Sequence, residues 1–164
     1  GRWQRAQGRV SMKRVRYWSV RNAGWLHVVY QGLEKLLLAL HPLLAKVGYR
    51  RLDAPFARVE KIVKGFLFDS KSCGQCTLGS TGLACPMNCP KTLRNGPCGG
   101  VRADGGCEID PEMTCVWVTA WQGSQRVGQP ETTIQVIQPP LDSRLNGTSA
   151  WLREVRTKLG IKDL

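Results

Sequence analysis

The hydrophobic and polar positions near the start of the chain alternate with the period of a helix. Apolar residues recur there at intervals of three and four: Leu26, Val29, Leu33, Leu37 and Leu40. This spacing predicts an amphipathic helix over residues 25–41 that ends or kinks near Pro42. The apolar face of such a helix has to be covered by another part of the protein.

A second helix is predicted to start at Asp53, because Asp is a good N-terminal cap and Pro55 suits the first turn. Its apolar stripe is Phe56, Val59, Ile62, Val63 and Phe66. We expect the two helices to pack on each other through their apolar residues.

The two ends of the chain show different patterns. Gly1–Tyr17 is basic and lacks helical periodicity, which predicts an extended segment. Thr132–Ile137 reads as a short strand stopped by Pro139 and Pro140. Beyond it, Ser149 is expected to cap a last helix that ends at Gly160. The residues expected to face inward from this helix are Trp151, Leu152, Val155 and Leu159.

Charge and cysteine content divide the chain of 164 residues into three segments. The net charge is +12, and residues 1–69 alone contribute +10. All seven cysteines lie between Cys73 and Cys115 in a segment without net charge. The predicted organisation is therefore a basic helical arm (1–52), a cysteine-rich module (53–124) and a Pro/Gly-rich tail (125–164). The expected fold class is small α plus irregular structure, with one short C-terminal strand and helix.

The cysteines follow the spacing C-x2-C-x8-C-x3-C-x8-C-x8-C-x7-C. Disulfides suit this set poorly, because seven is odd and no secretory signal is evident. Zinc would prefer two C-x2-C pairs, and only Cys73 and Cys76 form one, so zinc stays open for one site. Iron–sulfur ligation is favoured by the irregular loop spacing and the neighbouring glycines.

Two local patterns strengthen the iron–sulfur interpretation. Cys85-Pro86 and Cys89-Pro90 resemble the Cys-Pro step that closes a bacterial cluster-binding run. Ser70-x2-Cys73-x2-Cys76 has the spacing of a cluster loop with serine at the first position. The Gly-Pro-Cys-Gly-Gly turn around Cys98 could aim backbone N–H groups at sulfur.

These residues together carry a family resemblance over roughly residues 50–122. The blocks concerned are Cys73–Cys76, Cys85–Lys91, Arg94–Gly100, Gly106–Glu108 and Cys115–Trp117. They resemble the C-terminal module of methylenetetrahydrofolate reductase systems, which occurs as a small subunit beside a flavin-binding reductase or fused after the reductase barrel. The family pattern has a further cysteine where this chain has Ser70.

The resemblance implies one or two [4Fe–4S] clusters that exchange electrons with a flavin in the partner. The implied ligands are Cys73, Cys76, Cys85, Cys89, Cys98, Cys107 and Cys115. Two such clusters need eight ligands, so Ser70 or Asp69 would supply an oxygen, one iron would be open, or one site would hold zinc. The residues expected around the ligands are Ser70, Lys91, Arg94, Asn95, Gly96, Gly99 and Gly100. Trp117 and Trp121 would either shield a cluster from water or pack against the helices.

Three functions are weighed from these patterns. The first is an electron-transfer subunit of a methylenetetrahydrofolate reductase-type complex, itself non-catalytic, because no phosphate loop and no Ser/His/Asp arrangement is visible. The second is a structural zinc or iron–sulfur subunit of a larger complex. The third, a zinc module that binds nucleic acid through the basic arm, is disfavoured because the cysteine segment is neutral. No membrane span is expected, since Glu34 and Lys35 interrupt the longest apolar stretch, and metal-binding thiols suit the cytoplasm.

Overall fold

The computed structural model describes residues 9–161, and within that range the chain is mainly helical. Its α-helices are α1 (Arg9–Arg21), α2 (Ala23–Ala39), α3 (His41–Val47), α4 (Tyr49–Phe68), α5 (Val116–Val127) and α6 (Ala150–Lys158). Short 3-10 turns are η2 (Pro86–Asn88), η3 (Glu131–Thr133) and η4 (Ser143–Leu145). The described residues contain no β-strand, only two isolated β-bridges between residues 101 and 114.

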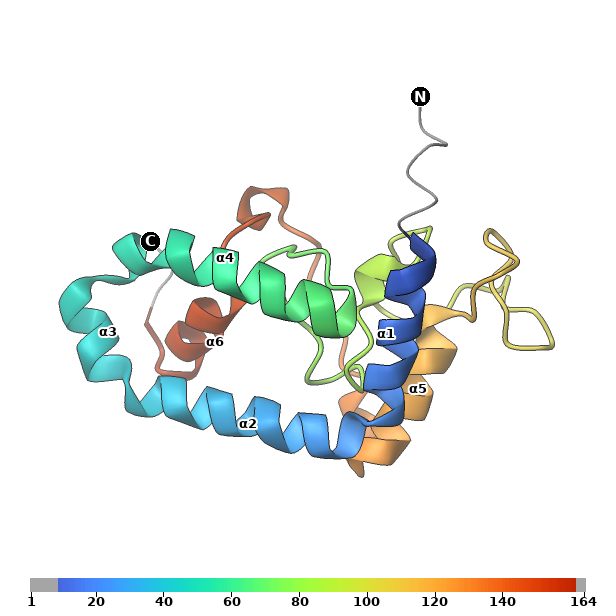
Figure 1. Cartoon of the computed structure of the whole chain (residues 1–164), viewed down its shortest axis with the longest axis horizontal. Helices are drawn as coiled ribbons and strands as arrows, with labels where there is room; N and C mark the ends of the chain where they lie inside the picture. The colour runs from blue at the N-terminus through green and yellow to red at the C-terminus, as the bar shows by residue number, and fades with distance from the viewer. Residues whose placement is uncertain (1–8, 162–164) are drawn as a thin grey trace.

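The long helices α2 and α4 form two arms that α3 joins at one end (Figure 1). Helix α6 lies between the two arms and contacts both of them. At the other end α1 packs on α4 and α5, and α5 packs on α2. The cysteine-rich loops run between α4 and α5 in the chain. The loop that follows α4 lies between the two arms, whereas the loop that leads into α5 projects beyond α5 (Figure 1). Helices from the three predicted segments, 1–52, 53–124 and 125–164, therefore pack against one another.

The predicted first helix is confirmed as α2, which ends at Ala39 and is followed at Leu40 by the turn into α3. Pro42 lies in the first turn of α3, where its missing N–H costs nothing. Leu26 and Leu37 are buried as predicted, but Val29 is exposed. The main partners of α2 are α5 and α6. Helix α4 meets α2 through Lys64, whose ammonium lies 5.6 Å from the centre of the Tyr30 ring, and not through its exposed residues Val59 and Ile62.

Helix α4 starts at Tyr49, four residues before the predicted cap. The N–H groups of Arg51 and Leu52 already bond to the carbonyl of Gly48, which places Pro55 inside the helix. Asp53 does not cap its own helix, because its carboxylate accepts a hydrogen bond from the backbone N–H of Ser149, 3.1 Å away. The predicted cap is therefore wrong, because the carboxylate bonds to Ser149, which lies 96 residues further along the chain.

The two faces of α4 are the reverse of the prediction. Its buried residues are Glu60, Lys64 and Phe68, whereas Val59 and Ile62 of the apolar stripe are exposed. The inward carboxylate of Glu60 accepts hydrogen bonds from α6, as described below. Tertiary hydrogen bonding thus overrides the hydrophobic pattern of this helix.

Residues 9–17 belong to α1, so the extended segment predicted for Gly1–Tyr17 is wrong over that part, and residues 1–8 lie outside the described residues. Arg16, Ser19 and Val20 are buried at helical spacing, and the Ser19 hydroxyl donates to the carbonyl of Leu67 in α4. Of these three residues only Arg16 lies before Tyr17, so the sequence up to Tyr17 does not contain the spacing that would reveal this face.

The predicted strand over Thr132–Ile137 is wrong. A 3-10 turn occupies its first residues, and Val136 and Ile137 are exposed. No other strand of the described chain lies alongside to satisfy the backbone of this segment, and an isolated strand is not stable in water. The terminal helix α6 is confirmed. The side chain of Ser149 caps it by accepting a hydrogen bond from the backbone N–H of Leu152. Leu152 and Val155 are buried as predicted, whereas Leu159 is exposed.

Two glycines allow α5 to approach the cysteine-rich loop closely. A side chain at Gly123 would collide with the carbonyl oxygen of Gly82, whose own φ is +54°. We predict that Gly123→Ala lowers the free energy of unfolding by about 2 kcal/mol or more. Gly65→Ala in α4, where an added methyl meets no atom, should raise it by about 0.5–1 kcal/mol. Chemical denaturation measures both, and equal stability of the two variants would contradict this packing.

Candidate functional site

All seven cysteines are free thiols. Cys85 and Cys115 are buried, and the other five are half-buried. None is fully exposed, which distinguishes this set from incidental surface cysteines. The loops between α4 and α5 carry six of them, and Cys115 directly precedes α5.

Three of the predicted ligands meet around one small cavity. Cys73, Cys76 and Cys85 line it together with Ser70 and Arg94. Ser70 follows directly after Asp69, the C-terminal cap of α4 in left-handed conformation (φ +49°), so the helix end aims the chain into the cavity. The structure thus brings together the first three cysteines, the serine before them and a basic residue from the Arg94–Gly100 block.

Cys85 has the environment of a buried sulfur ligand. Burial raises the pKa of its thiol, whereas backbone N–H groups of Lys71 and Met87 that donate to the sulfur lower the pKa. Cys76 and Cys73 raise the pKa of Cys85 further, because a second negative charge nearby opposes ionisation. These shifts also show that the three sulfurs are close enough to interact electrostatically.

Arg94 brings a positive charge to the same cavity. One terminal nitrogen, Nη2, donates to the carbonyl of Gln75 at 3.0 Å. The other, Nη1, is buried and has no hydrogen-bond partner among the described residues. A buried guanidinium nitrogen without a partner is costly, so Nη1 can donate to an acceptor that the described residues do not supply.

Two residues that the sequence did not indicate lie beside Cys76. The hydroxyl of Tyr30, from α2, is 3.9 Å from the Cys76 sulfur. Lys64, from α4, is 2% exposed. Burial alone lowers the pKa of Lys64, but Cys76, Tyr30 and Glu60 raise it more strongly, so the amine stays protonated. Glu60 and Lys64 are one helical turn apart, a spacing that permits an ion pair but does not reveal that the pair is buried beside a cysteine.

Lys64 belongs to a buried network that joins α4 to α6. Its ammonium donates to Glu60 Oε1 at 2.6 Å. Glu60 Oε2 accepts from the Ser149 hydroxyl at 2.8 Å and from the Trp151 backbone N–H at 3.2 Å. The carboxylate therefore satisfies N-terminal donors of α6 and interacts favourably with the positive end of that helix.

A second group forms around Cys98. The thiol of Cys98 donates to Glu108 Oε1 at 3.7 Å, and Lys91 forms an ion pair with the same carboxylate. A side chain at Gly100 would meet the carboxylate of Glu108, which is the flexible end of a half-exposed side chain and can move aside. Lys91 thus lies near a predicted ligand, though its observed partner is Glu108.

The other predicted residues have mostly structural contacts. Asn95 exchanges two hydrogen bonds with the backbone of Gln138 and so ties its loop to the tail. Gly96 has a φ of +120°, a conformation that favours glycine, whereas a side chain at Gly99 would meet no atom. Trp117 donates to the carbonyl of Leu93 at 3.1 Å, and Trp117 and Trp121 both line a cavity beside Cys98.

The remaining cysteines lie apart from the first cavity. Cys89, Cys98, Cys107 and Cys115 do not line it. The N–H of Cys107 bonds to the carbonyl of Met113 at 2.8 Å, and Cys115 packs in the core with Val20 and Trp117. The structure therefore gathers three of the seven predicted ligands directly and leaves the other four in the surrounding loops.

The donors around the first cavity are three thiols and one serine hydroxyl. Thiols are the usual ligands of iron–sulfur clusters and are also ligands of zinc. Within residues 14–161, no group of three or more His, Cys, Asp or Glu side chains is arranged to hold one metal ion.

Fold and site define a small, mainly helical, cysteine-rich domain that encloses a thiol-lined cavity. Residues 49–144 match the family described as methylene-tetrahydrofolate reductase C terminal, and the chain belongs to this family. The match confirms the resemblance seen in the cysteine blocks and covers α4, all seven cysteines and α5. No curated protein and no solved structure matches the chain.

Among residues 9–161, no helix combines the length and the apolar character that a membrane span needs.

The buried ion pair gives a direct test of the site's architecture. We predict that Lys64→Met lowers the free energy of unfolding by about 3–5 kcal/mol, because Glu60 would be left as an uncompensated buried charge. Lys71→Met, which removes the half-exposed partner of Asp69, should cost less than about 0.5 kcal/mol. Urea unfolding monitored by circular dichroism measures both, and a Lys64→Met protein as stable as the wild type would contradict the buried network.

Proposed function

We propose that this chain binds iron–sulfur clusters through its cysteines and serves as the electron-transfer component of a methylenetetrahydrofolate reductase-type complex. Such a cluster, when bound, accepts and releases one electron at a time. The chain's own residues hold the cluster, exclude water from it and balance its charge. Its partner is a flavin-bearing reductase, on which the chemistry of the one-carbon substrate takes place.

The observation that carries this proposal is the cavity lined by Cys73, Cys76 and Cys85. Its walls combine thiol donors with the unpartnered nitrogen of Arg94, so they offer ligands and a compensating positive charge in one place. The backbone N–H groups that donate to the Cys85 sulfur would stabilise a thiolate there. Membership of the reductase C-terminal family supports the same assignment.

Ser70 gives the cavity a fourth candidate donor. It lines the cavity with the three cysteines, at the position where the family pattern has a further cysteine. The fourth iron of the first cluster would then bind the serine oxygen or have no protein ligand. In either case the first cluster would not need the four remaining cysteines. Those four would serve a second cluster or a zinc ion.

The buried cation Lys64 supports an electron-transfer role. Its ammonium is fixed beside Cys76, where it would favour the more negative, reduced state of a neighbouring cluster. Thiols that must stay reduced to bind metal also place the protein in a reducing compartment, and we propose the cytoplasm.

We propose that the partner docks on the outward face of α4. Val59, Ile62, Val63 and Phe66 form one exposed apolar stripe at helical spacing, and Ile62 is 71% exposed. Exposed Arg58 and Lys61 flank the stripe, whereas the two acids of this helix, Asp53 and Glu60, bond to α6 instead. An apolar surface with only positive charges beside it fits a reductase surface that is apolar with acidic residues around it.

This docking would bring the partner close to the thiols. Residues on the other side of α4, including Ala57 and Lys64, line a cavity with Cys73 and Cys76. A helix with its side chains is about 10–12 Å across. A partner on the stripe would therefore lie roughly one helix diameter from the sulfurs, a short path for electron transfer.

The first test is metal analysis of the full chain purified without oxygen. We predict iron and acid-labile sulfide in equal amounts and a brown colour. Cys85→Ala should lose iron, because it removes a buried ligand with two N–H donors already in place. Ser80→Ala, outside this cavity, is the matched control and should keep the wild-type content.

Two results of that analysis would overturn the cluster assignment. One is zinc without sulfide, which would indicate a structural zinc protein. The other is an unchanged iron content in Cys85→Ala while its fold, monitored by circular dichroism, stays intact.

The second test concerns the docking face. We predict that Ile62→Glu weakens binding to the flavin-bearing reductase of the same source at least tenfold, because a carboxylate would be buried in an apolar contact. Ile109→Glu, an exposed isoleucine between Cys107 and Cys115, should leave the dissociation constant within about twofold. Titration calorimetry gives both values, and an equal effect of the two variants would contradict docking on α4.

A further inference from the structure

An apolar cavity lies beside Cys98, between the face of α5 that carries Trp117 and Trp121 and the tail segment 134–137. Its volume is about 710 Å³. This volume is within the range of sites that bind small molecules, so a ligand of several fused rings has room there. Neither the first cavity around Cys85 nor the proposed docking face of α4 is part of it.

Two anchors fix the tail segment that forms one wall of the cavity. At one end, Ile134 packs against the buried cluster around Trp117. At the other end, the amide nitrogen of Asn95 donates to the carbonyl of Gln138 at 3.0 Å, and the amide oxygen accepts from the Gln138 N–H at 2.7 Å. The residues between these anchors are therefore held on both sides, and the wall they form belongs to the fold.

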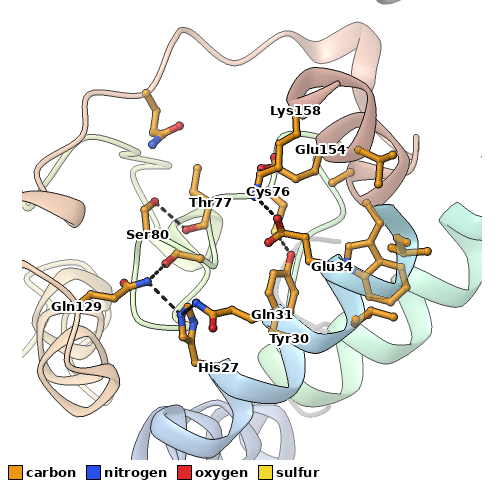
Figure 2. A pocket seen from close by; sticks show the side chains of 17 residues that line it. His27, Tyr30, Gln31, Glu34, Cys76, Thr77, Ser80, Gln129, Glu154 and Lys158 are labelled. Atoms are coloured by element: carbon orange, nitrogen blue, oxygen red, sulfur yellow. Dashed lines mark hydrogen bonds and ion pairs between the residues drawn. The ribbon is translucent and has the colours of Figure 1, made fainter. Parts of the chain in front are cut away.

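The lining of this cavity carries no charge. Among the described residues that line it there is no Asp, Glu, Lys, Arg or His. The cavity between α2 and α6 differs, because Glu34, Glu154 and Lys158 line it and pair with one another (Figure 2). A charged ligand beside Trp121 would find no partner of opposite charge, and burying an unpaired charge is costly. The lining therefore selects an uncharged ligand.

Several apolar side chains of the lining are open to solvent. Trp121 is 42% exposed, Val136 is 56% exposed and Ile137 is 83% exposed. A ligand that covers them removes apolar surface from water on both sides of the contact. The hydrophobic effect thus favours an occupant that fills the space between α5 and the tail.

The two tryptophans favour an aromatic occupant over an aliphatic one. They are one helical turn apart on α5, and both line the cavity. The indole N–H of Trp117 donates to the carbonyl of Leu93 at 3.1 Å, which fixes the orientation of that ring. Aromatic rings that pack offset or edge to face gain stabilisation beyond the apolar area they bury.

We propose that this cavity binds an uncharged aromatic molecule of about two to four fused rings. Trp121 contacts the ring system from α5, and Val136 and Ile137 cover it from the tail. The inference does not depend on the iron–sulfur proposal, although Cys98 lines the cavity. Iron and sulfide are measured on the same samples as ligand binding, so loss of one property without the other separates the two proposals.

The experiment is titration calorimetry of the full chain, purified without oxygen, with three two-ring probes at pH 7. 2-Naphthol is uncharged and aromatic, decahydro-2-naphthol has the same frame without aromatic rings, and 2-naphthoate is an aromatic anion. We expect one-to-one binding of 2-naphthol, at least about threefold weaker binding of the saturated alcohol and at least about tenfold weaker binding of the anion. The anion is a stringent comparison, because the net charge of +12 by itself would attract it.

Val136→Asp places a carboxylate in the wall of the cavity. Because Val136 is already 56% exposed, the fold should be kept, and 2-naphthol binding should weaken about fivefold or more. The matched control is Ile109→Asp, at a loop residue that is 57% exposed and lies outside the cavity. Its affinity should stay within about twofold of the wild type. Unchanged affinity in a folded Val136→Asp protein would place the probe elsewhere and overturn the assignment.

Trp121→Leu tests the aromatic preference, because it removes the more exposed of the two rings and keeps an apolar side chain. The affinities for 2-naphthol and the saturated alcohol should then agree within about 1.5-fold. Trp18→Leu is the matched control, since Trp18 is 48% exposed in α1 and lies outside the cavity. This control should keep the wild-type preference.

Three results for the wild-type chain would overturn the proposal. Equal affinity for the two alcohols would mean that the cavity accepts any apolar group, such as a side chain of a protein partner. Binding of 2-naphthoate as tight as that of 2-naphthol would show that net charge, and not the cavity, attracts the probes. The third result is no binding of 2-naphthol up to about 5 mM, which is weak even for a fragment.

Discussion

The carboxylate of Glu60 at the N-terminus of α6 is the interaction on which the arrangement of this protein depends. It accepts hydrogen bonds from Ser149 and Trp151 and pairs with the buried ammonium of Lys64. A helix end buried between two other helices needs acceptors for its free N–H groups, and α4 supplies them. The same contact fixes Lys64 beside Cys76, so one ion pair joins the helical frame to the thiol-lined cavity.

This requirement also explains the exposed apolar surface. A helix that turns Glu60 and Lys64 inward must turn the residues on its opposite side outward, and in α4 these are Val59, Ile62 and Phe66. The hydrophobic pattern that would normally mark a core-facing stripe is exposed here and forms the surface on which we propose that the partner docks. In that proposal one helix has the partner on one side and the cysteines on the other.

Cys76 lies where the functional features meet. It lines the cavity with Cys73 and Cys85, and it also lines the larger cavity between α2 and α6. The hydroxyl of Tyr30 and the ammonium of Lys64 approach it from two different helices. Because helices rather than loops supply these neighbours, the charge and hydration around Cys76 are set by the most rigid part of the fold.

The sequence by itself determined the family, the α6 cap at Ser149, the end of α2 before Pro42 and the cysteines as the centre of interest, because these depend on local spacing and residue chemistry. Only the tertiary structure decided which face of α4 is buried, that residues 9–17 are helical and that Thr132–Ile137 forms no strand. Each of these depends on partners supplied from distant parts of the chain. Tyr30, Lys64 and the unpartnered nitrogen of Arg94 are likewise invisible to pattern, since a hydrogen bond and its absence are properties of three-dimensional packing.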